Sequence, residues 1–276
     1  TGNGMGIITK HDLDGNRIWG KVMEGPDHGF GTCVSPQLVG NTLIVRMGDY
    51  AGLDPKTGEE LWRVEDPATF GPPASFQVED EWYLFTVRGE LIRVSDGKKL
   101  LSEDWAIPQK KFAFFNTPFV DGKHVYVVHG AAGIQGDAYC MKIPDTKEEI
   151  IENGLTEVWY SQVSKERYYT SPLVHEGIMY IMSMGNRFQA LNAKTGDVIY
   201  SEKIDGMKGR AFTGVTLVGD KLLVGEEDGT LVFIEPGPTF KETLRLDLGE
   251  NRSTPIFDGD TAYLRTIEHL YAFKDR

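Results

Sequence analysis

The chain is a succession of short apolar segments separated by polar turns. Representative segments read LIVRM, WYLFTV, HVYVV, IMYIM and LLVGE, and they are rich in β-branched and aromatic residues. Segments of this length and composition favour β-strands. The 3.6-residue spacing of apolar positions that indicates amphipathic helices is absent. The pattern therefore predicts an all-β protein.

Pairs of apolar segments recur with a period of about forty residues. A pair of turn-forming residues joins the two segments of each unit, and most of these pairs contain a glycine or asparagine that tolerates positive φ. The turn pairs are Gly40–Asn41, Glu79–Asp80, Asp121–Gly122, Glu176–Gly177, Gly219–Asp220 and Asp258–Gly259. Their spacing is 39, 42, 55, 43 and 39 residues, which indicates one hairpin in each repeat.

A second turn follows each of these hairpins. It is clearest in residues 52–62, GLDPKTGEELW, and 190–200, ALNAKTGDVIY. A glycine ends the turn and a large side chain follows four residues later, in the pairs Gly15/Trp19, Gly58/Trp62, Gly97/Leu101 and Gly196/Tyr200. We expect the glycine to be left-handed and the large side chain to pack between neighbouring sheets. Two hairpins in about forty residues make a four-stranded blade, so the repeat predicts a β-propeller.

The repeat boundaries predict a single β-propeller domain over residues 1–276, with about seven blades represented. A partial blade covers 1–25, five full blades cover 31–66, 72–105, 114–164, 168–205 and 211–248, and a closing blade covers 251–276. The longest blade has room for a short helix over 145–154, capped by Asp145 and ended by Gly154. The two ends together supply five strands, one more than a blade needs, so we expect that residues before Thr1 are missing.

The two turn segments resemble the AxDxxTGxxxW signature of the pyrroloquinoline-quinone-like β-propeller repeats. Residues 254–274, TPIFDGDTAYLRTIEHLYAFK, are similar to the last blade of the BamB-like subgroup of outer-membrane assembly proteins. The resemblance extends over nearly the whole chain. It implies an eight-bladed family, here truncated at the N-terminus, and an exported protein of the periplasm, cell envelope or extracellular space.

The quinone-dependent dehydrogenases with this repeat carry two adjacent cysteines and a Glu, Asn and Asp calcium site. Here the two cysteines, Cys33 and Cys140, are far apart, and no such triad can be placed. We therefore expect no catalytic residues, no cofactor and no metal, although a quinone-dependent enzyme stays an alternative. Whether Cys33 and Cys140 form a disulfide is left open.

The net charge and the short motifs argue against several classes of partner and site. The net charge of −12 disfavours nucleic acid and anionic membranes as partners. No apolar run approaches the roughly 18 residues of a transmembrane segment. The acidic stretches 12–16 and 226–229 could hold a cation, but both lie where the repeat predicts a plain hairpin turn.

The loops that lead into the innermost strands of the blades share an unusual composition. Most carry an aromatic residue and most carry Lys or Arg, in a protein that is acidic as a whole. The predicted ligand-binding residues are His28, Phe30, Lys111, Phe114, Arg167, Tyr168, Arg210, Phe212 and Arg252, with Phe70 and Asn251 in the same loops. Since equivalent loops of a propeller meet at the mouth of its channel, we expect a local positive patch with aromatics among the cations.

These observations predict a non-catalytic binding or scaffold protein, a monomer or part of a larger envelope complex. Its expected partner is a protein, or an anionic peptide or glycan bound through guanidinium groups and ring faces. A carbohydrate- or ligand-sensing module is the second interpretation. Packing of the same aromatics between blades, with the cations simply solvated, explains the pattern without any ligand.

Overall fold

The computed structural model describes all residues except 1, 3–5, 24–33, 66–69, 101–114 and 275–276. The described residues form twenty-four β-strands and one helix, α1 (Lys147–Asn153). The predicted all-β class is confirmed. Among the described residues, no helix has the length and apolar character needed to cross a membrane.

The chain divides into two compact units. The first consists of residues 1–123 and 142–156, and the second of residues 124–141 and 157–276. The division passes through one four-stranded sheet, formed by β10 (Phe119–Asp121), β11 (His124–His129), β12 (Gly136–Lys142) and β13 (Thr156–Val163). The single domain expected over residues 1–276 stays a prediction.

The first unit contains three further sheets in chain order. They are the hairpin β1 (Ile7–His11) and β2 (Arg17–Val22), the four-stranded sheet β3 (Gln37–Val39), β4 (Thr42–Met47), β5 (Asp49–Leu53) and β6 (Glu60–Val64), and the three-stranded sheet β7 (Ala74–Val78), β8 (Glu81–Phe85) and β9 (Leu91–Arg93). Each strand pairs antiparallel with the next along the chain. This up-and-down order is the topology of propeller blades.

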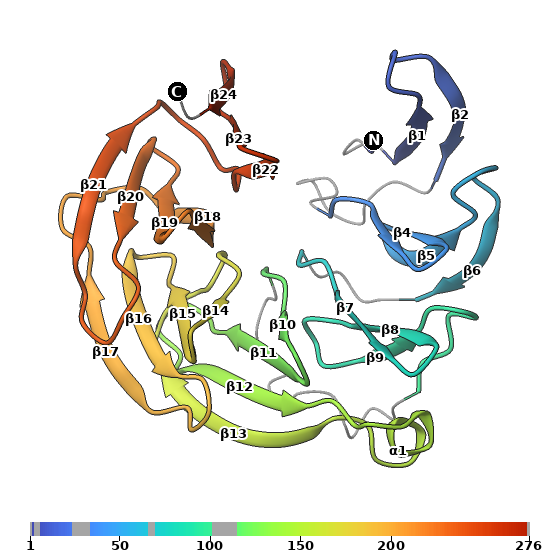
Figure 1. Ribbon diagram of the computed structural model, residues 1–276, viewed down its shortest axis with the longest axis horizontal. Coiled ribbons are helices and arrows are strands. Elements are labelled where there is room, and N and C mark those ends of the chain that lie inside the picture. Colours follow the sequence, from blue (N-terminus) through green and yellow to red (C-terminus); the bar gives the residue numbers. More distant parts are fainter. Residues whose placement is uncertain (1, 3–5, 24–33, 66–69, 101–114, 275–276) are drawn as a thin grey trace. The chain divides into compact units, whose positions relative to one another are not determined.

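The second unit repeats the same order, which the yellow to red ribbons of Figure 1 follow. Its sheets are β14 (Leu173–His175), β15 (Ile178–Met182), β16 (Arg187–Asn192) and β17 (Val198–Lys203); β18 (Ala211–Val218), β19 (Lys221–Glu226), β20 (Thr230–Ile234) and β21 (Glu242–Asp247); and β22 (Ile256–Asp258), β23 (Thr261–Arg265) and β24 (Leu270–Lys274). A shared core joins the first two, with Tyr180 and Phe188 packed among Leu222, Val224 and Val232.

The sheets agree with the predicted blade boundaries. Four predicted blades have four strands each, and the closing blade has the expected three. The blade predicted over 72–105 has three described strands, and its last residues, 101–105, lie outside the described residues. The described residues thus form six sheets of three or four strands and one terminal hairpin, so the expected number of about seven is reached only if the hairpin is counted.

Tryptophan side chains join consecutive sheets by the same contact at three places. Trp62 of β6 donates its Nε1 hydrogen to the carbonyl oxygen of Val94 at 2.7 Å, in the sheet that follows. A β-carbon at Gly97 would lie 2.7 Å from the Trp62 ring, so the ring covers the glycine of the next turn. The other pairs are Trp19 with Pro55 and Gly58, and Trp159 with Ala193 and Gly196. The predicted packing of large side chains between sheets is confirmed for Trp19 and Trp62.

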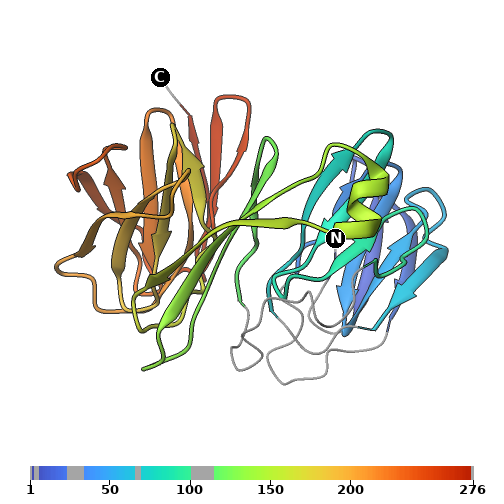
Figure 2. The same ribbon diagram turned by 90° about the horizontal axis from the view of Figure 1, so that it is seen from below.

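Helix α1 lies in the connection between β12 and β13, as predicted, and within the first unit it is tied to the β7–β8 turn (Figure 2). Lys147 makes an ion pair of 2.6 Å with Asp80 in that turn. The predicted N-cap was wrong by one residue: Thr146 is the cap, and its side chain accepts the Glu149 amide hydrogen. Gly154 ends the helix with a φ of 63°, as expected.

Replacing Thr146 with alanine should lower the free energy of unfolding by about 1 kcal/mol, because one amide of the first helical turn loses its acceptor. Thr146→Ser keeps the hydroxyl and should stay within a few tenths of a kcal/mol of the wild type. Chemical denaturation measures both changes. Equal losses in the two variants would show that the hydroxyl does not cap this helix.

Candidate functional site

The three predicted arginines come from equivalent positions in the second unit. Arg167 precedes β14, Arg210 immediately precedes β18, and Arg252 precedes β22. Four antiparallel strands bring the chain back to the end of the sheet at which it entered. The loops that lead into successive blades therefore lie at equivalent ends of their sheets. Two of the three arginines meet directly at one acidic side chain.

That acidic side chain is Glu227, in the turn between β19 and β20. Arg210 holds it with two contacts, Nε to Oε1 at 2.6 Å and Nη2 to Oε2 at 3.1 Å. Arg252 reaches the same carboxylate, with Nη2 2.9 Å from Oε2. The arginine side chains are 52% and 56% exposed, whereas the Glu227 side chain is only 12% exposed. One carboxylate therefore bridges two guanidinium groups that reach the solvent.

Aromatic rings stand beside this bridge. The guanidinium carbons of Arg210 and Arg252 lie 5.6 and 5.1 Å from the centre of the Phe212 ring. Phe212 is stacked on Tyr169, with ring centres 4.8 Å apart and planes within 7°. Arg167 donates from Nη1 to the hydroxyl oxygen of Tyr169 at 3.4 Å. We call this group the arginine cluster: Arg167, Tyr169, Arg210, Phe212, Glu227 and Arg252.

Charge in the cluster is balanced in part. The hydrogen bonds from Arg210, with Arg252 beside it, hold the pKa of the Glu227 carboxyl below its usual value. The same contact raises the pKa of Arg210. Glu227 is therefore ionised at neutral pH and offsets one of the three guanidinium charges. The cluster keeps an excess of positive charge, smaller than the sequence predicted.

One predicted residue is placed differently from the expectation. Tyr168 is 1% exposed, and its hydroxyl donates to the Gln189 side chain at 3.0 Å. It therefore belongs to the core and does not stand among the cations. The next residue, Tyr169, points into the arginine cluster instead. Neighbouring strand-like positions face opposite sides, so an error of one residue exchanges a core side chain for a surface one.

Of the other residues in the predicted loops, some lie outside the described residues and two are described. His28, Phe30, Lys111 and Phe114 lie outside the described residues. Phe70 belongs to the first unit, where it stacks on Phe115 with ring centres 5.0 Å apart. Asn251 is buried, and its backbone N–H donates to the backbone carbonyl of Glu227 at 3.1 Å. Asn251 thus holds the backbone beside Arg252 and is not a surface contact residue.

Besides Tyr169, Glu227 is the member of the cluster that the sequence did not reveal. The segment 226–229 is the hairpin turn that the repeat predicts, with the Gly229 amide bonded to the Glu226 carbonyl. Buried Glu226 also accepts the Gly209 amide hydrogen. Within the described residues, no three His, Cys, Asp or Glu side chains gather in a way that could hold a metal ion. Cys140 is buried in β12, where burial raises the pKa of its thiol to about 11, and Cys33 lies outside the described residues.

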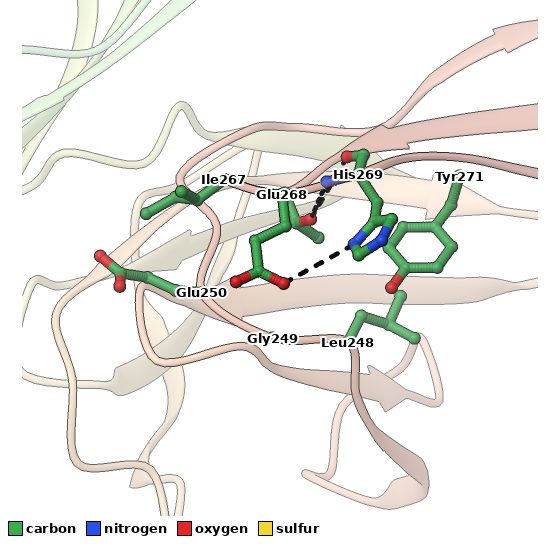
Figure 3. Close-up of a pocket in the computed structure, with 8 residues that line it drawn as sticks. Leu248, Gly249, Glu250, Ile267, Glu268, His269 and Tyr271 are labelled. Carbon is green, nitrogen blue, oxygen red and sulfur yellow. Dashed lines mark hydrogen bonds and ion pairs between the residues drawn. The ribbon is translucent and has the colours of Figure 1, made fainter.

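A small pocket adjoins the segment that carries Arg252 (Figure 3). It has a volume of about 260 Å³. Its lining comes from the β21–β22 connection and from the β23–β24 turn with the start of β24: Leu248, Gly249, Glu250, Thr266, Ile267, Glu268, His269 and Tyr271. The Nδ1 atom of His269 lies 4.0 Å from Oε2 of Glu268, and the centres of the His269 and Tyr271 rings are 5.7 Å apart. The pocket is thus mixed in character, with two carboxylates and an aromatic wall.

The sequence profile of one protein family matches this chain over residues 2–140 and 152–275. That family is described as outer membrane protein assembly factor BamB. The chain belongs to the BamB family. The predicted family resemblance is therefore confirmed, and so is the quinone-like propeller repeat. The comparison with curated proteins gives no match.

Solved structures support the fold of this BamB-family chain. BamB from Moraxella catarrhalis is 15% identical, with a TM-score of 0.54 over 97% of this chain and 90% of its own. The computationally designed Ika8 protein is 13% identical, with a TM-score of 0.68 over 99% of this chain and 79% of its own. The quinohemoprotein alcohol dehydrogenase ADHIIG from Pseudomonas putida HK5 is 14% identical, with a TM-score of 0.53 over 79% of this chain and 42% of its own.

Proposed function

We propose that this BamB-family chain is a non-catalytic scaffold of the cell envelope that binds protein partners during outer membrane protein assembly. The match to the BamB family over most of the chain supports the class of function. The arginine cluster carries the proposal further, because it supplies a defined surface for a partner. We propose the periplasm, or the periplasmic face of the outer membrane, as the place where it acts.

The chemistry of the cluster suits an acidic segment of a partner protein. The side chains of Arg210 and Arg252 are about half exposed, and guanidinium groups bind carboxylates in a planar, two-point geometry. Phe212 and Tyr169 add a stacked aromatic surface next to the charges. Arginine and aromatic residues are enriched where proteins bind other proteins. An acidic peptide segment is therefore the ligand that the described residues fit best.

The sequence argues against the dehydrogenase alternative. ADHIIG shares the fold at 14% identity, and this chain covers 42% of it. Adjacent cysteines, which the quinone-dependent enzymes with this repeat carry, do not occur in this sequence. One fold of this kind hosts many functions, so the shared propeller alone does not imply a shared reaction.

Substituting both Arg210 and Arg252 with alanine should reduce partner binding at least about tenfold, since two charge-assisted contacts are lost. The assay is affinity capture from envelope extract with wild-type and variant protein, followed by identification and quantification of the bound proteins. Outer membrane assembly proteins should bind the wild type and be depleted with the variant.

Arg245→Ala is the matched control for this experiment. Arg245 also makes a two-point contact with a glutamate, Glu242, in the same sheet, but it lies on the outer strand β21. This variant should capture partners as the wild type does. Capture that is unchanged in the double variant, or that never includes outer membrane assembly proteins, would contradict the proposal.

A further inference from the structure

The Glu227 carboxylate already occupies the position in the arginine cluster that suits an incoming acidic group. Its Oε1 atom accepts a hydrogen bond from Nε of Arg210. Its Oε2 atom accepts one from Nη2 of Arg210 and forms an ion pair with Nη2 of Arg252. These are the donors with which arginine binds a carboxylate in a planar, two-point geometry. A ligand carboxylate that used the same donors would have to replace Glu227.

We propose that Glu227 is an internal competitor that sets the affinity and charge selectivity of the arginine cluster, so that an acidic partner binds by displacing it. The proposal rests on the proposed function, because it assumes that the cluster receives an acidic segment. It assigns Glu227 a role beyond the turn between β19 and β20.

The backbone keeps Glu227 in place whatever its side chain does. The backbone N–H of Glu227 donates to the backbone carbonyl of Arg210 at 2.9 Å, and the backbone N–H of Asn251 donates to the backbone carbonyl of Glu227 at 3.1 Å. The main chain of Glu227 is thus fixed between the two segments that carry the arginines. The carboxylate also accepts the backbone amide hydrogen of Arg210 at 3.3 Å. A rotation of the Glu227 side chain that breaks this contact and the two ion pairs is therefore enough to release the guanidinium groups.

The arginines also stay placed when the carboxylate leaves. Both guanidinium groups lie against the Phe212 ring, which attracts cations through its face. Phe212 in turn is supported by the parallel stack with Tyr169. The rings therefore hold the two arginines in similar positions with or without Glu227. If Glu227 is a competitor, the arginines keep their positions when its carboxylate is removed. If its role is only structural, the arginines lose their positions.

Competition by a tethered carboxylate has a measurable size. A group attached next to its partner acts at an effective concentration in the millimolar range or above. The apparent dissociation constant of an external ligand equals the intrinsic one divided by the fraction of the site that is free, so it rises about tenfold when the tethered group occupies about nine-tenths of the site. Removing the negative charge of Glu227 should therefore strengthen binding of an acidic ligand by about tenfold or more.

The test uses a hexaglutamate peptide as the probe, titrated into the full chain and followed by calorimetry, with hexaglutamine as the neutral control peptide. Glu227→Gln keeps the shape of the side chain and removes its charge. We expect this variant to bind hexaglutamate about tenfold more tightly than the wild type. Its affinity should also fall more steeply with salt up to about 0.15 M, because more ligand charges are then paired with arginine.

Glu242→Gln is the matched control. It makes the same change in net charge within the same sheet, and Glu242 makes the same two-point contact, with Arg245. This variant should bind hexaglutamate as the wild type does. Arg210→Ala combined with Arg252→Ala should remove binding in the wild-type and in the Glu227→Gln background alike.

The outcomes separate the two proposals. If the wild type binds through the arginines but Glu227→Gln binds equally or more weakly, Glu227 is no competitor, while the acidic-ligand site stands. If neither the wild type nor Glu227→Gln binds hexaglutamate, the site itself is refuted, and the competitor with it. Nuclear magnetic resonance of the arginine Nε–H groups gives a readout on unmodified protein. The Arg210 signal should shift when the protein is saturated with hexaglutamate, while the Arg245 signal should not. An unshifted Arg210 signal would contradict the displacement of Glu227.

Discussion

Replacing Trp62 with alanine should lower the free energy of unfolding by about 3–5 kcal/mol. The side chain is 8% exposed on β6 and packs with Tyr50, Leu84 and Ile92. Truncation leaves a cavity between two sheets, and it also removes the hydrogen bond to the carbonyl oxygen of Val94. A buried carbonyl without its partner adds to the loss from the cavity.

Chemical denaturation followed by circular dichroism measures this loss, and two further variants divide it into its causes. Trp62→Phe keeps most of the ring but loses the donor, so it should cost about 1–2 kcal/mol. Leu61→Ala changes the neighbouring side chain, which is 55% exposed, and should stay within about 0.5 kcal/mol of the wild type. Equal losses for Trp62→Ala and Leu61→Ala would contradict the role of Trp62 as a contact between sheets.

The sequence predicted that Trp62 packs between neighbouring sheets, because the glycine turn and the large side chain that follows it form a local pattern. Gly58 and Trp62 are four residues apart in one turn, and the period of about forty residues shows that the turn recurs. Left-handed φ values of 76° at Gly58 and 71° at Gly97 follow from the turn type. The sequence did not show which carbonyl the indole would meet, since that depends on the packing of two sheets. Trp159 makes the same contact, but the inserted helix interrupts the pattern before it.

The arginine cluster was predictable only in part, for a physical reason. The sequence predicted Arg167, Arg210 and Arg252 from their repeat positions alone, because equivalent loops of successive blades lie at the same end of their sheets. Glu227 contacts Arg210 although it lies 17 residues further along the chain. It comes from the turn between β19 and β20, not from a loop that leads into a blade. A hairpin turn rich in acidic residues is explained by its solubility and turn propensity alone, so its sequence carries no sign of the bridge.

The exchange of Tyr168 for Tyr169 shows a limit of another kind. The sequence marked an aromatic residue in this loop, but it could not decide which of two adjacent tyrosines faces outward. The register of the loop is set by the hydrogen bond of Tyr168 to Gln189, a residue of β16 that is itself 3% exposed. Tyr168 is therefore held in the core by a buried polar partner, and Tyr169 is the tyrosine that reaches the arginine cluster.

Replacing Gly97 with alanine should lower the free energy of unfolding by about 2–5 kcal/mol, from two separate causes. The φ of 71° places Gly97 in the left-handed region, where a side chain costs about 1–2 kcal/mol. The added β-carbon would also lie 2.7 Å from the Trp62 ring, so the ring or the turn has to move. Overpacking of this kind costs about 1–3 kcal/mol.

Gly15→Ala isolates the first cause. Gly15 occupies the same position of the repeat and has a φ of 88°, but a β-carbon there would meet no described atom within 4 Å. It should therefore show only the backbone cost of about 1–2 kcal/mol. A loss for Gly97→Ala that is no larger than that for Gly15→Ala would refute the steric argument.

A double-mutant cycle with Trp62→Ala completes the test, because the two changes act on one contact. When the ring is already gone, the new methyl group at Gly97 has space, and the additional loss should shrink to the backbone cost alone. The expected coupling between the two substitutions is therefore about 1–3 kcal/mol in the favourable direction. Strict additivity would mean that the glycine is required only for its backbone conformation. The recurring pair of glycine and tryptophan would then be two independent features of the repeat.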